Sequence, residues 1–423
     1  MKRLLLATSL SILLPLTSCV ENPVTGERNL GLVSEGQEIQ IGEENYVATR
    51  QMQGGEYYLD PALQDYVNRV GQRVAAQSSR QLPYEFTVLN NDVPNAWALP
   101  GGKIAINRGL LVELDNEAEL AAVLGHEVVH AAARHSAQQI ERSMLLQLGV
   151  VAAGVAASDT EYAGLAVGAG LVGAQLINSK YGREAELESD RYGMRYMADA
   201  GYDADAAVSL QETFVRLSEG NNPGWLGGLF ASHPPSQERV ARNREIASQL
   251  PDGGELGRSA YQRATEKIRN DKPAYAAYNK GVKALADGNV SSAETLAREA
   301  LAAVPNEAKF HALLGNIALA KENSSAAFNH FDKAVQLFPR FFEYRIHRGI
   351  LYMQRDALDA AREDFDVANQ LLPTAIAYEN LGDIAVKQGR RQDAIDAYSI
   401  AAKSDSAAGK RAREKLARLQ SGG

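Results

Sequence analysis

Apolar residues at helical spacing open the folded part of this chain. Ser34, with Gln37 three residues later, has the spacing of a capping box and predicts a helix that extends to about Gln53. A second helix is predicted to begin at Asp60-Pro61, because Asp caps helix ends and Pro suits the first helical position. The apolar residues of this second helix recur every three or four positions, at Leu63, Val67, Val70 and Val74.

The pattern then changes to the alternation that is typical of strands. Residues 84–89 alternate and predict one strand. Residues 95–99 and 103–106, separated by Pro100-Gly101-Gly102, predict a hairpin with a tight turn. Asp115 is expected to cap the helix that follows.

Residues 144–178 are almost wholly apolar and rich in Ala and Gly, with a polar interruption at 159–162. Each half has about 15 residues, fewer than the roughly 20 that a helix needs to cross a bilayer. The stretch therefore predicts a helical hairpin packed through small residues. A hairpin that dips into a membrane is the alternative.

The last third of the chain repeats every 34 residues. The period is carried by Pro305, Pro339 and Pro373, by Gly281, Gly315 and Gly349, and by Ala300, Ala334 and Ala368. Such a period is typical of tetratricopeptide repeats, which are helix pairs that stack into a solenoid. We expect four repeats, at about 274–307, 308–341, 342–374 and 375–408, followed by a basic capping helix and tail over 409–423.

The N-terminus has the pattern of an export signal. Residues 1–18 begin with Met1-Lys2-Arg3 and continue with a short apolar run, so we interpret them as a signal peptide. The residues before Cys19 are similar to a bacterial lipobox, which makes Cys19 the expected lipidation site and 19–33 a tether. Simple cleavage with an incidental cysteine is the alternative. Cys19 is the only cysteine, so it cannot form a disulfide within the chain.

Composition limits the class of protein. The net charge of −8 gives no reason to expect binding to nucleic acid. The chain that would remain after export, about 405 residues, is long enough for two or three domains.

The stretch His126-Glu127-Val128-Val129-His130 carries the clearest chemistry. Two imidazoles four residues apart on a helix point the same way and can bind one metal ion. Glu127 faces the same cleft and can take a proton from water. The flanking residues are small and apolar, which predicts a buried helix where unliganded histidines would be costly. A helix with two incidental surface histidines is therefore disfavoured.

A catalytic zinc site needs a third protein ligand. Residues 183–191 offer two pairs of acidic residues at helical spacing. In the first pair, Glu186 can reach the metal while Asp190 hydrogen-bonds a ligand imidazole. Glu184 and Glu188 form the alternative pair, which we expect to be solvated.

The pattern of His126, Glu127 and His130 followed by Glu186 and Asp190 resembles the HExxH…ExxxD motif of the bacterial HtpX-type and CAAX-prenyl-protease family of zinc metallopeptidases. The segments 95–102 and 232–235, with Arg239 after the second, are also similar to segments of that family, and the similarity runs from about residue 22 to 240. Joined to the repeats, the chain resembles the subgroup of periplasmic proteases that enhance β-barrel assembly.

The resemblance implies a mainly α (α+β) fold, with a zincin-type metallopeptidase domain and a small β-sheet over 34–265 followed by the solenoid. It also implies one Zn²⁺ per chain, bound by His126, His130 and Glu186, with Glu127 as general base for peptide hydrolysis.

Several further residues have open roles. His233 lies in a predicted loop and would stabilise the oxyanion, occupy the open zinc position and hold the enzyme latent, or cap its loop. Arg239 is expected to order that loop through a carboxylate such as Asp190. Asn95, Ala96, Trp97 and Ala98 are expected to form a strand that pairs with extended substrates. A structural role is expected for His135, which is on a different side of the helix from His130. His311, His330 and His347 lie in the repeats and are not expected to be ligands.

Two functions remain in competition. The first is an envelope zinc endopeptidase, facing the periplasm from the outer membrane through a lipid anchor, that acts on unfolded or misassembled envelope proteins and recruits substrate or assembly machinery through its repeats. The second is a chaperone or adaptor with a latent or vestigial metal site. An intact Glu127 favours the first, because a binding module needs no general base. A membrane-embedded prenyl-protein protease is disfavoured, because no segment is long enough to span.

Overall fold

The protein is described by a computed structural model over residues 19–142, 180–220 and 228–421. The predicted signal peptide (1–18) and the predicted apolar hairpin (144–178) lie outside the described residues. The N-terminal part consists of β1 Cys19–Glu21, β2 Arg28–Leu30, α1 Glu35–Met52, α2 Pro61–Ala75, β3 Glu85–Leu89, β4 Ala96–Leu99, the 3₁₀ turn η1 Pro100–Gly102, β5 Lys103–Asn107, α3 Arg108–Leu111, α4 Glu117–Ala132, α7 Arg183–Asp199, α8 Asp205–Glu219, α10 Leu229–Ser232, α11 Gln237–Ala247 and α12 Arg258–Asn270.

The predicted caps of the first two helices are confirmed. Ser34 and Gln37 form a reciprocal capping box at the start of α1, which ends at Met52. The Asp60 carboxylate accepts the Leu63 N–H at the start of α2. The cap of α4 was assigned wrongly, because Asn116 and not Asp115 accepts the Glu119 N–H. Asp115, one residue before the cap, instead donates its backbone N–H to the Glu119 carboxylate.

The three-stranded sheet has the order β3-β5-β4. The predicted hairpin is present, with β4 and β5 antiparallel across η1, while β3 and β5 pair in parallel. Gly101 and Gly102 both have positive φ in the turn. A Cβ on Gly101 would lie 2.6 Å from Ile39 Cα, so this turn lets α1 approach the sheet closely. Strand β4 is left at the edge of the sheet.

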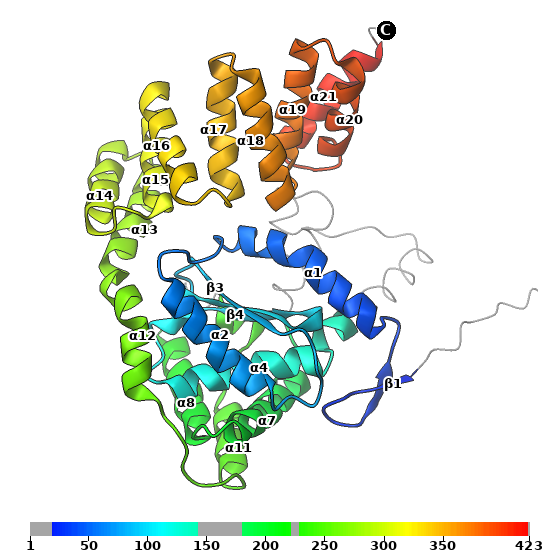
Figure 1. Cartoon of the computed structure of the whole chain (residues 1–423), viewed down its shortest axis with the longest axis vertical. Coiled ribbons are helices and arrows are strands. Elements are labelled where there is room, and N and C mark those ends of the chain that lie inside the picture. The colour runs from blue at the N-terminus through cyan, green and yellow to red at the C-terminus, as the bar shows by residue number, and fades with distance from the viewer. Residues whose placement is uncertain (1–18, 143–179, 221–227, 422–423) are drawn as a thin grey trace, which may run out of the picture.

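Helices cover both faces of the sheet (Figure 1). On one face, Tyr46 of α1 packs edge-to-face on Trp97 at 6.0 Å between ring centroids. On the other face, Ala96 and Ala98 join the large core that α2 and α4 form. The side chains of β4 alternate between the two faces of the sheet, and both faces are buried. Helix α4 packs on the face that carries Ala96 and Ala98.

The segment predicted as a tether is a packed element over most of its length. Strands β1 and β2 form an antiparallel ribbon. Asn22, in the turn between them, is 3% exposed, and its amide donates to the Glu188 carboxylate of α7 at 3.0 Å. The segment predicted as a tether, 19–33, is therefore fixed on the helical layer at Asn22 by this partly buried hydrogen bond.

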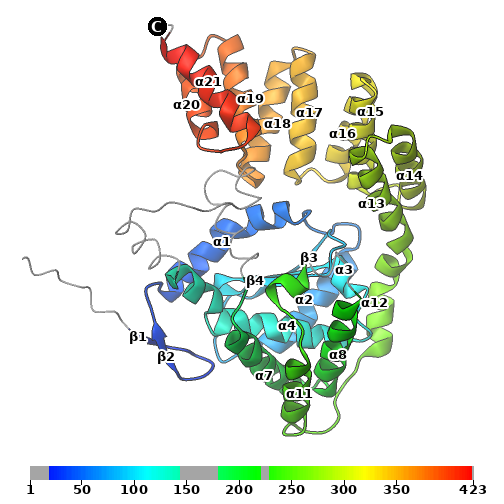
Figure 2. The ribbon, with the colours of Figure 1, turned by 180° about the vertical axis from the view of Figure 1, so that it is seen from behind.

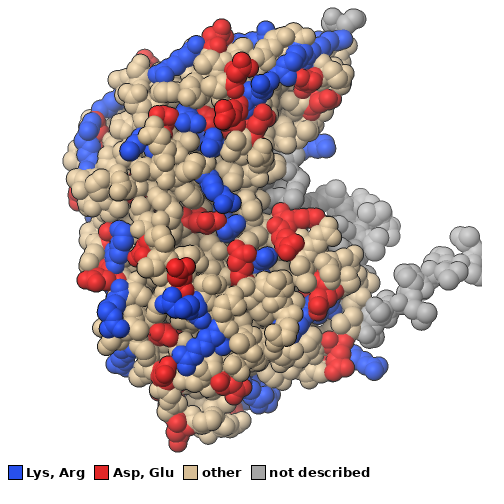
Figure 3. Space-filling model, viewed as in Figure 1, with Lys and Arg blue, Asp and Glu red and all other residues tan. Residues whose placement is uncertain are grey.

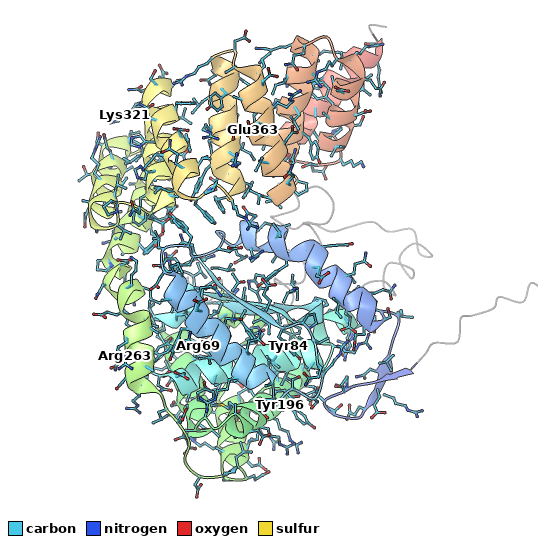
Figure 4. All side chains as sticks on the ribbon, viewed as in Figure 1. Arg69, Tyr84, Tyr196, Arg263, Lys321 and Glu363 are labelled. Atoms are coloured by element: carbon cyan, nitrogen blue, oxygen red, sulfur yellow. The ribbon has the colours of Figure 1, made fainter. Side chains whose placement is uncertain are left out.

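The loop after α2 is fixed by two tyrosines that Figure 4 labels. The Tyr196 hydroxyl of α7 donates to Ser79 Oγ at 2.9 Å and accepts the Ser79 N–H at 3.0 Å. The Tyr84 hydroxyl lies 2.9 Å from Ser78 Oγ. The loop therefore ties α7 to the sheet.

The C-terminal part is a solenoid of helix pairs, and the predicted fold class is confirmed. The pairs are α13 Lys272–Ala286 with α14 Val290–Ala303, α15 Ala308–Ala320 with α16 Ser324–Leu337, α17 Phe342–Gln354 with α18 Leu358–Leu371, and α19 Ala375–Lys387 with α20 Arg391–Ala401. The last helix, α21 Ala407–Ser421, packs on α19 and α20.

Glycines set the spacing within each pair. Gly315 of α15 faces the ring of Phe331 in α16, and a Cβ on Gly315 would lie 2.8 Å from that ring. Gly349 faces Phe365, and Gly382 faces Tyr398, in the same way. In these three pairs the glycine therefore marks where an aromatic ring of the second helix fills the space, whereas Gly281 of the first pair faces Leu313 and Leu296.

The solenoid arches over the side of the sheet that α1 covers (Figure 1). Tyr58 stacks on Phe338 at 4.7 Å between ring centroids. Gln51 at the end of α1 donates to the Arg340 carbonyl and accepts from the Phe342 N–H. On the face seen in Figure 3, acidic and basic side chains are interspersed over the repeats.

Candidate metal centre

Helix α4 presents His126, Glu127 and His130, all of them buried. Helix α7 runs against it, and the two backbones approach at paired glycines. A Cβ on Gly193 would lie 2.9 Å from the His126 backbone nitrogen, and one on Gly125 would lie 3.0 Å from the Gly193 carbonyl oxygen. This close approach places the acidic residues of α7 beside the histidines of α4.

Four buried side chains converge: His126, His130, Glu186 and His233. The two Nε2 atoms of His126 and His130 are 3.0 Å apart. His233 Nδ1 lies 3.3 Å from His126 Nε2 and 3.0 Å from Glu186 Oε1. Glu186 Oε1 is also 3.5 Å from His130 Nε2.

These separations fit a metal ion. Ligands at 2.0–2.1 Å from a tetrahedral zinc ion are about 3.3–3.4 Å from one another. The observed separations of 3.0–3.5 Å lie close to that value. Two ring nitrogens 3.0 Å apart also require a proton or a cation between their lone pairs. The donor set therefore suits a divalent cation.

The pKa shifts of the cluster also bear on whether it can bind a metal ion. Although burial lowers it, Glu186 and Asp190 raise the pKa of His126 to about 9. Burial keeps the pKa of His130 well below its ordinary range. Burial raises the pKa of the Glu186 carboxyl, but His233 and His126 outweigh it and hold the pKa well below its usual range. Glu186 therefore stays ionised and His130 stays neutral, which are the forms of these side chains that bind a metal ion.

The predicted partner of a ligand imidazole is in place. Asp190 Oδ1 lies 2.9 Å from His126 Nδ1, on the side of the ring away from the other donors. Arg239 donates to both oxygens of Asp190 at 2.7 Å. Burial raises the pKa of Asp190, but Arg239 more than compensates and lowers it. Asp190 therefore stays a carboxylate that orients the His126 ring.

His233 directly follows the short helix α10 and is the one member of the cluster that comes from outside α4 and α7. Its Nδ1 atom lies among the donors, and its Nε2 atom is 3.5 Å from Glu127 Oε1. The Leu229 carbonyl accepts the His233 N–H at 2.7 Å, which holds this residue at the end of α10. Glu127 Oε2 is buried without a hydrogen-bond partner among the described residues. Burial raises the pKa of Glu127.

Sequence reasoning missed the role of His135. Helix α4 ends at Ala132, and Arg134 has a left-handed φ of 66°, so the chain turns before 135–142 resumes as a helix. This turn brings His135 Nδ1 to 2.9 Å from His130 Nδ1. His135 Nε2 is 3.5 Å from Glu188, which is therefore not simply solvated as predicted. A regular helix would have placed His135 on another side, and only the turn at Arg134 would have revealed the contact.

The edge strand lies close to the donors. Ser136 donates to the Ala98 carbonyl at 3.3 Å and is 2.8 Å from the Tyr181 hydroxyl. The Tyr181 ring stacks on His130 at 3.9 Å. Among the predicted substrate-strand residues, Ala96, Trp97 and Ala98 are buried in β4, and Asn95 precedes it.

Comparisons with known proteins divide the chain in the same way. Residues 61–247 match peptidase family M48, and residues 312–376 and 379–420 match a tetratricopeptide repeat family. The chain is 31% identical over 225 residues to the beta-barrel assembly-enhancing protease of Escherichia coli (strain K12), a match that covers 52% of this chain and 45% of that protein. It is 34% identical over 188 residues to the mitochondrial metalloendopeptidase OMA1 of Schizosaccharomyces pombe, which covers 44% of this chain and 53% of that protein.

These matches span about half the length of the curated relatives. Among solved structures, YrrB, described as a TPR protein with an unusual peptide-binding site, is 18% identical, covers 50% of this chain and 92% of its own, and superposes with a TM-score of 0.30.

In the part of the chain that the structure describes, helices are too short or too polar to cross a membrane. The buried His/Glu cluster falls within the 61–247 match. The chain therefore contains a domain of peptidase family M48, followed by tetratricopeptide repeats.

Proposed function

We propose that this protein is a zinc endopeptidase of the cell envelope whose resting site is closed by His233. The observation that carries the proposal is the four-donor cluster with Glu127 directly beside it. Catalytic zinc sites use three protein ligands and one open position, whereas four protein ligands are typical of closed sites. We assign His126, His130 and Glu186 as the three permanent ligands of one Zn²⁺ and His233 as the removable fourth.

The residues then divide the reaction between them. A bound zinc ion supplies Lewis acidity, which polarises the scissile carbonyl and makes water more acidic. Glu127 takes the proton from the attacking water and delivers it to the leaving amine nitrogen. Its raised pKa, caused by burial, makes it a stronger proton acceptor than an exposed carboxylate.

Latency follows from where His233 lies. Because its Nδ1 atom lies 3.3 Å from His126 Nε2 and 3.0 Å from Glu186 Oε1, His233 would take the place that water or substrate needs beside a bound metal ion. Removal of His233 requires movement at α10, which contributes only four residues.

Substrate delivery is assigned to the edge strand and the repeats. An extended peptide can pair with β4 at the edge of the sheet, which gives main-chain hydrogen bonds without strong sequence preference. The relatives are named as beta-barrel assembly-enhancing proteases, which supports unfolded or misassembled outer-membrane proteins as substrates. The repeats would bring these substrates, or the assembly machinery, to the peptidase domain, for which we propose the limits 34–265.

Two substitutions test the catalytic proposal in the full chain. Glu127→Gln should lower cleavage of unfolded β-casein by about 10²–10⁴-fold at equal zinc content, because only the proton transfer is lost. His233→Ala should raise the basal rate and keep zinc bound. Undiminished cleavage by Glu127→Gln would reject the catalytic proposal. Absence of cleavage by both the unaltered chain and His233→Ala would favour the chaperone or adaptor function instead.

Location is tested separately. We propose that Cys19 carries a lipid that holds the protein at the outer membrane, facing the periplasm. Cys19→Ser should move the protein from the membrane fraction to the soluble fraction, with its cleavage rate on β-casein unchanged. Unchanged membrane association would reject the lipid anchor.

A further inference from the structure

The ribbon of β1 and β2 lies at the side of the helical layer, next to the start of α1 (Figure 2). Its turn is fixed from within, because Asn22 Oδ1 accepts the Val24 N–H at 2.9 Å and the Thr25 N–H at 3.4 Å. The nitrogen of the same amide points out of the ribbon and donates to Glu188 Oε1 of α7 at 3.0 Å. Asn22 therefore joins the ribbon to the helix that also carries Glu186.

The contact of Asn22 with Glu188 continues toward the metal centre. Glu188 Oε1 also lies 3.5 Å from His135 Nε2. His135 is 5% exposed, and its other ring nitrogen, Nδ1, lies 2.9 Å from His130 Nδ1. Successive contacts thus connect the ribbon to a proposed metal ligand, from Asn22 through Glu188 and His135 to His130.

The chemistry of the two rings sets the direction of these contacts when a metal ion is bound. His130 would bind the ion through Nε2, because that atom is 3.0 Å from His126 Nε2 and faces the other donors. The proton of His130 then resides on Nδ1, which donates to His135 Nδ1. His135 therefore carries its own proton on Nε2, where it faces the Glu188 carboxylate. Each N–H faces an acceptor, so the arrangement orients the His130 ring.

The residues after β2 hold the same part of the chain. The backbone N–H groups of 32–33 both donate to Glu141 Oε1 at 3.0 Å. The Val33 carbonyl accepts from the Arg134 guanidinium. Arg134, with its left-handed φ of 66°, forms the turn that precedes His135. The N-terminal segment therefore fixes the surroundings of His135 at two points, through the turn of the ribbon and through the residues that follow it.

We propose that the ribbon after Cys19 is part of the metal centre, and that Asn22 is a positioning residue for zinc. This inference rests on the proposed zinc site. The Asn22 N–H keeps the Glu188 carboxylate beside the His135 ring. That ring in turn keeps His130 Nε2 facing the other donors. Because β1 begins at Cys19, the proposed lipid anchor would be attached to the same ribbon.

The zinc affinity of the full chain, measured by competition with a chelator, tests the positioning role. Asn22→Asp keeps the oxygen that caps the turn, but it replaces the donor with a second carboxylate facing Glu188. It should weaken zinc binding by about tenfold, the lower end of the range for groups that orient metal ligands. Asn29→Asp makes the same change in β2, where the side chain has no hydrogen bond to the described residues, and should leave the affinity unchanged.

A double-substitution cycle separates positioning from a general loss of stability. If Asn22 acts through His135, then Asn22→Asp should weaken zinc binding no further in a chain that already carries His135→Ala. The visible absorption of the Co²⁺-loaded protein, which depends on ligand geometry, should change in the same direction in both single variants. Additive losses in the cycle, or a Co²⁺ spectrum that Asn22→Asp leaves unchanged, would overturn the positioning role.

These measurements need no turnover, so they separate this inference from the proposed peptidase function. If the unaltered chain cleaves no β-casein but Asn22→Asp weakens zinc binding as expected, the positioning role stands and the peptidase function fails. If Glu127→Gln abolishes cleavage but Asn22→Asp and Asn29→Asp bind zinc equally well, the peptidase function stands and the positioning role fails.

Discussion

The metal centre and the repeat array both depend on glycines that let two helices approach, but they fill the space differently. At the centre, Gly125 and Gly193 bring α4 against α7. The space beside them holds buried imidazoles and carboxylates. In the repeats, Gly315 brings α15 against α16, and the space holds the Phe331 ring.

The side chains that fill the space between the helices determine how each region responds to substitution. An aromatic ring contributes through burial and contact, so its loss reduces stability over the whole local core. A buried charge is tolerable only when it is paired, so each group at the centre needs a particular neighbour. Asp190 with Arg239 is such a pair, and the neutral His130 likewise relies on one neighbour, because its Nδ1 atom lies 2.9 Å from His135 Nδ1. We therefore expect substitutions in the repeats to lower the stability of the repeats, and substitutions at the metal centre to lower its affinity for zinc.

The largest expected effect comes from a substitution that destabilises the repeats and leaves the metal centre unchanged. Phe331 is 0% exposed, so Phe331→Ala should lower the free energy of unfolding of the repeats by about 3–5 kcal/mol. Urea titration with a fluorescence readout measures the loss. Phe328→Ala, on the same helix but half buried, should cost clearly less. Equal losses for both variants, or a loss of zinc affinity in Phe331→Ala, would contradict the comparison.

The next largest effect comes from a substitution that weakens zinc binding and leaves the repeats unchanged. His135→Ala removes the ring that fixes His130, and it should weaken zinc binding by about 10–100-fold without changing the urea midpoint of the repeats. Competition with a chelator measures the affinity. His135→Gln, which can still accept a hydrogen bond, should recover part of it. His311→Ala in the repeats serves as the control, and if it weakens zinc binding as much, His135 has no orienting role.

The smallest effect tests how firmly the two regions are joined. The Tyr58 hydroxyl donates to the Asn306 carbonyl and accepts the Ala308 N–H, both at 2.7 Å. Tyr58→Phe keeps the stacking on Phe338 and should cost about 1 kcal/mol in the free energy of unfolding. Tyr192→Phe, whose hydroxyl has no hydrogen bond within the described residues, is the control. A loss above about 3 kcal/mol would mean that docking depends on this hydroxyl more than on packing.

Local signals in the sequence predicted a large part of the fold. The caps of α1 and α2 could be predicted because a capping box and an Asp-Pro start involve residues within one helical turn. The repeat helices could be predicted because each pair packs chiefly on its neighbours, so the 34-residue period records the contacts directly. The α4 histidines are four residues apart, and helix geometry alone places them together.

Tertiary structure decided the contacts between distant segments. The sequence did not show that β5 would be the central strand or that Asn22 would be buried against α7. Nor could it show that the turn at Arg134 would direct His135 to His130.

The division has one physical cause. Periodicity and capping record forces that act within a helix or between adjacent repeats, so the sequence by itself determined the solenoid and the pair of histidines. Where a buried imidazole or carboxylate finds its partner depends on the backbone path between segments more than 50 residues apart, as for His126 with Asp190 and His233. No local pattern records that path, so only the folded chain determined that His233 places Nδ1 among the donors.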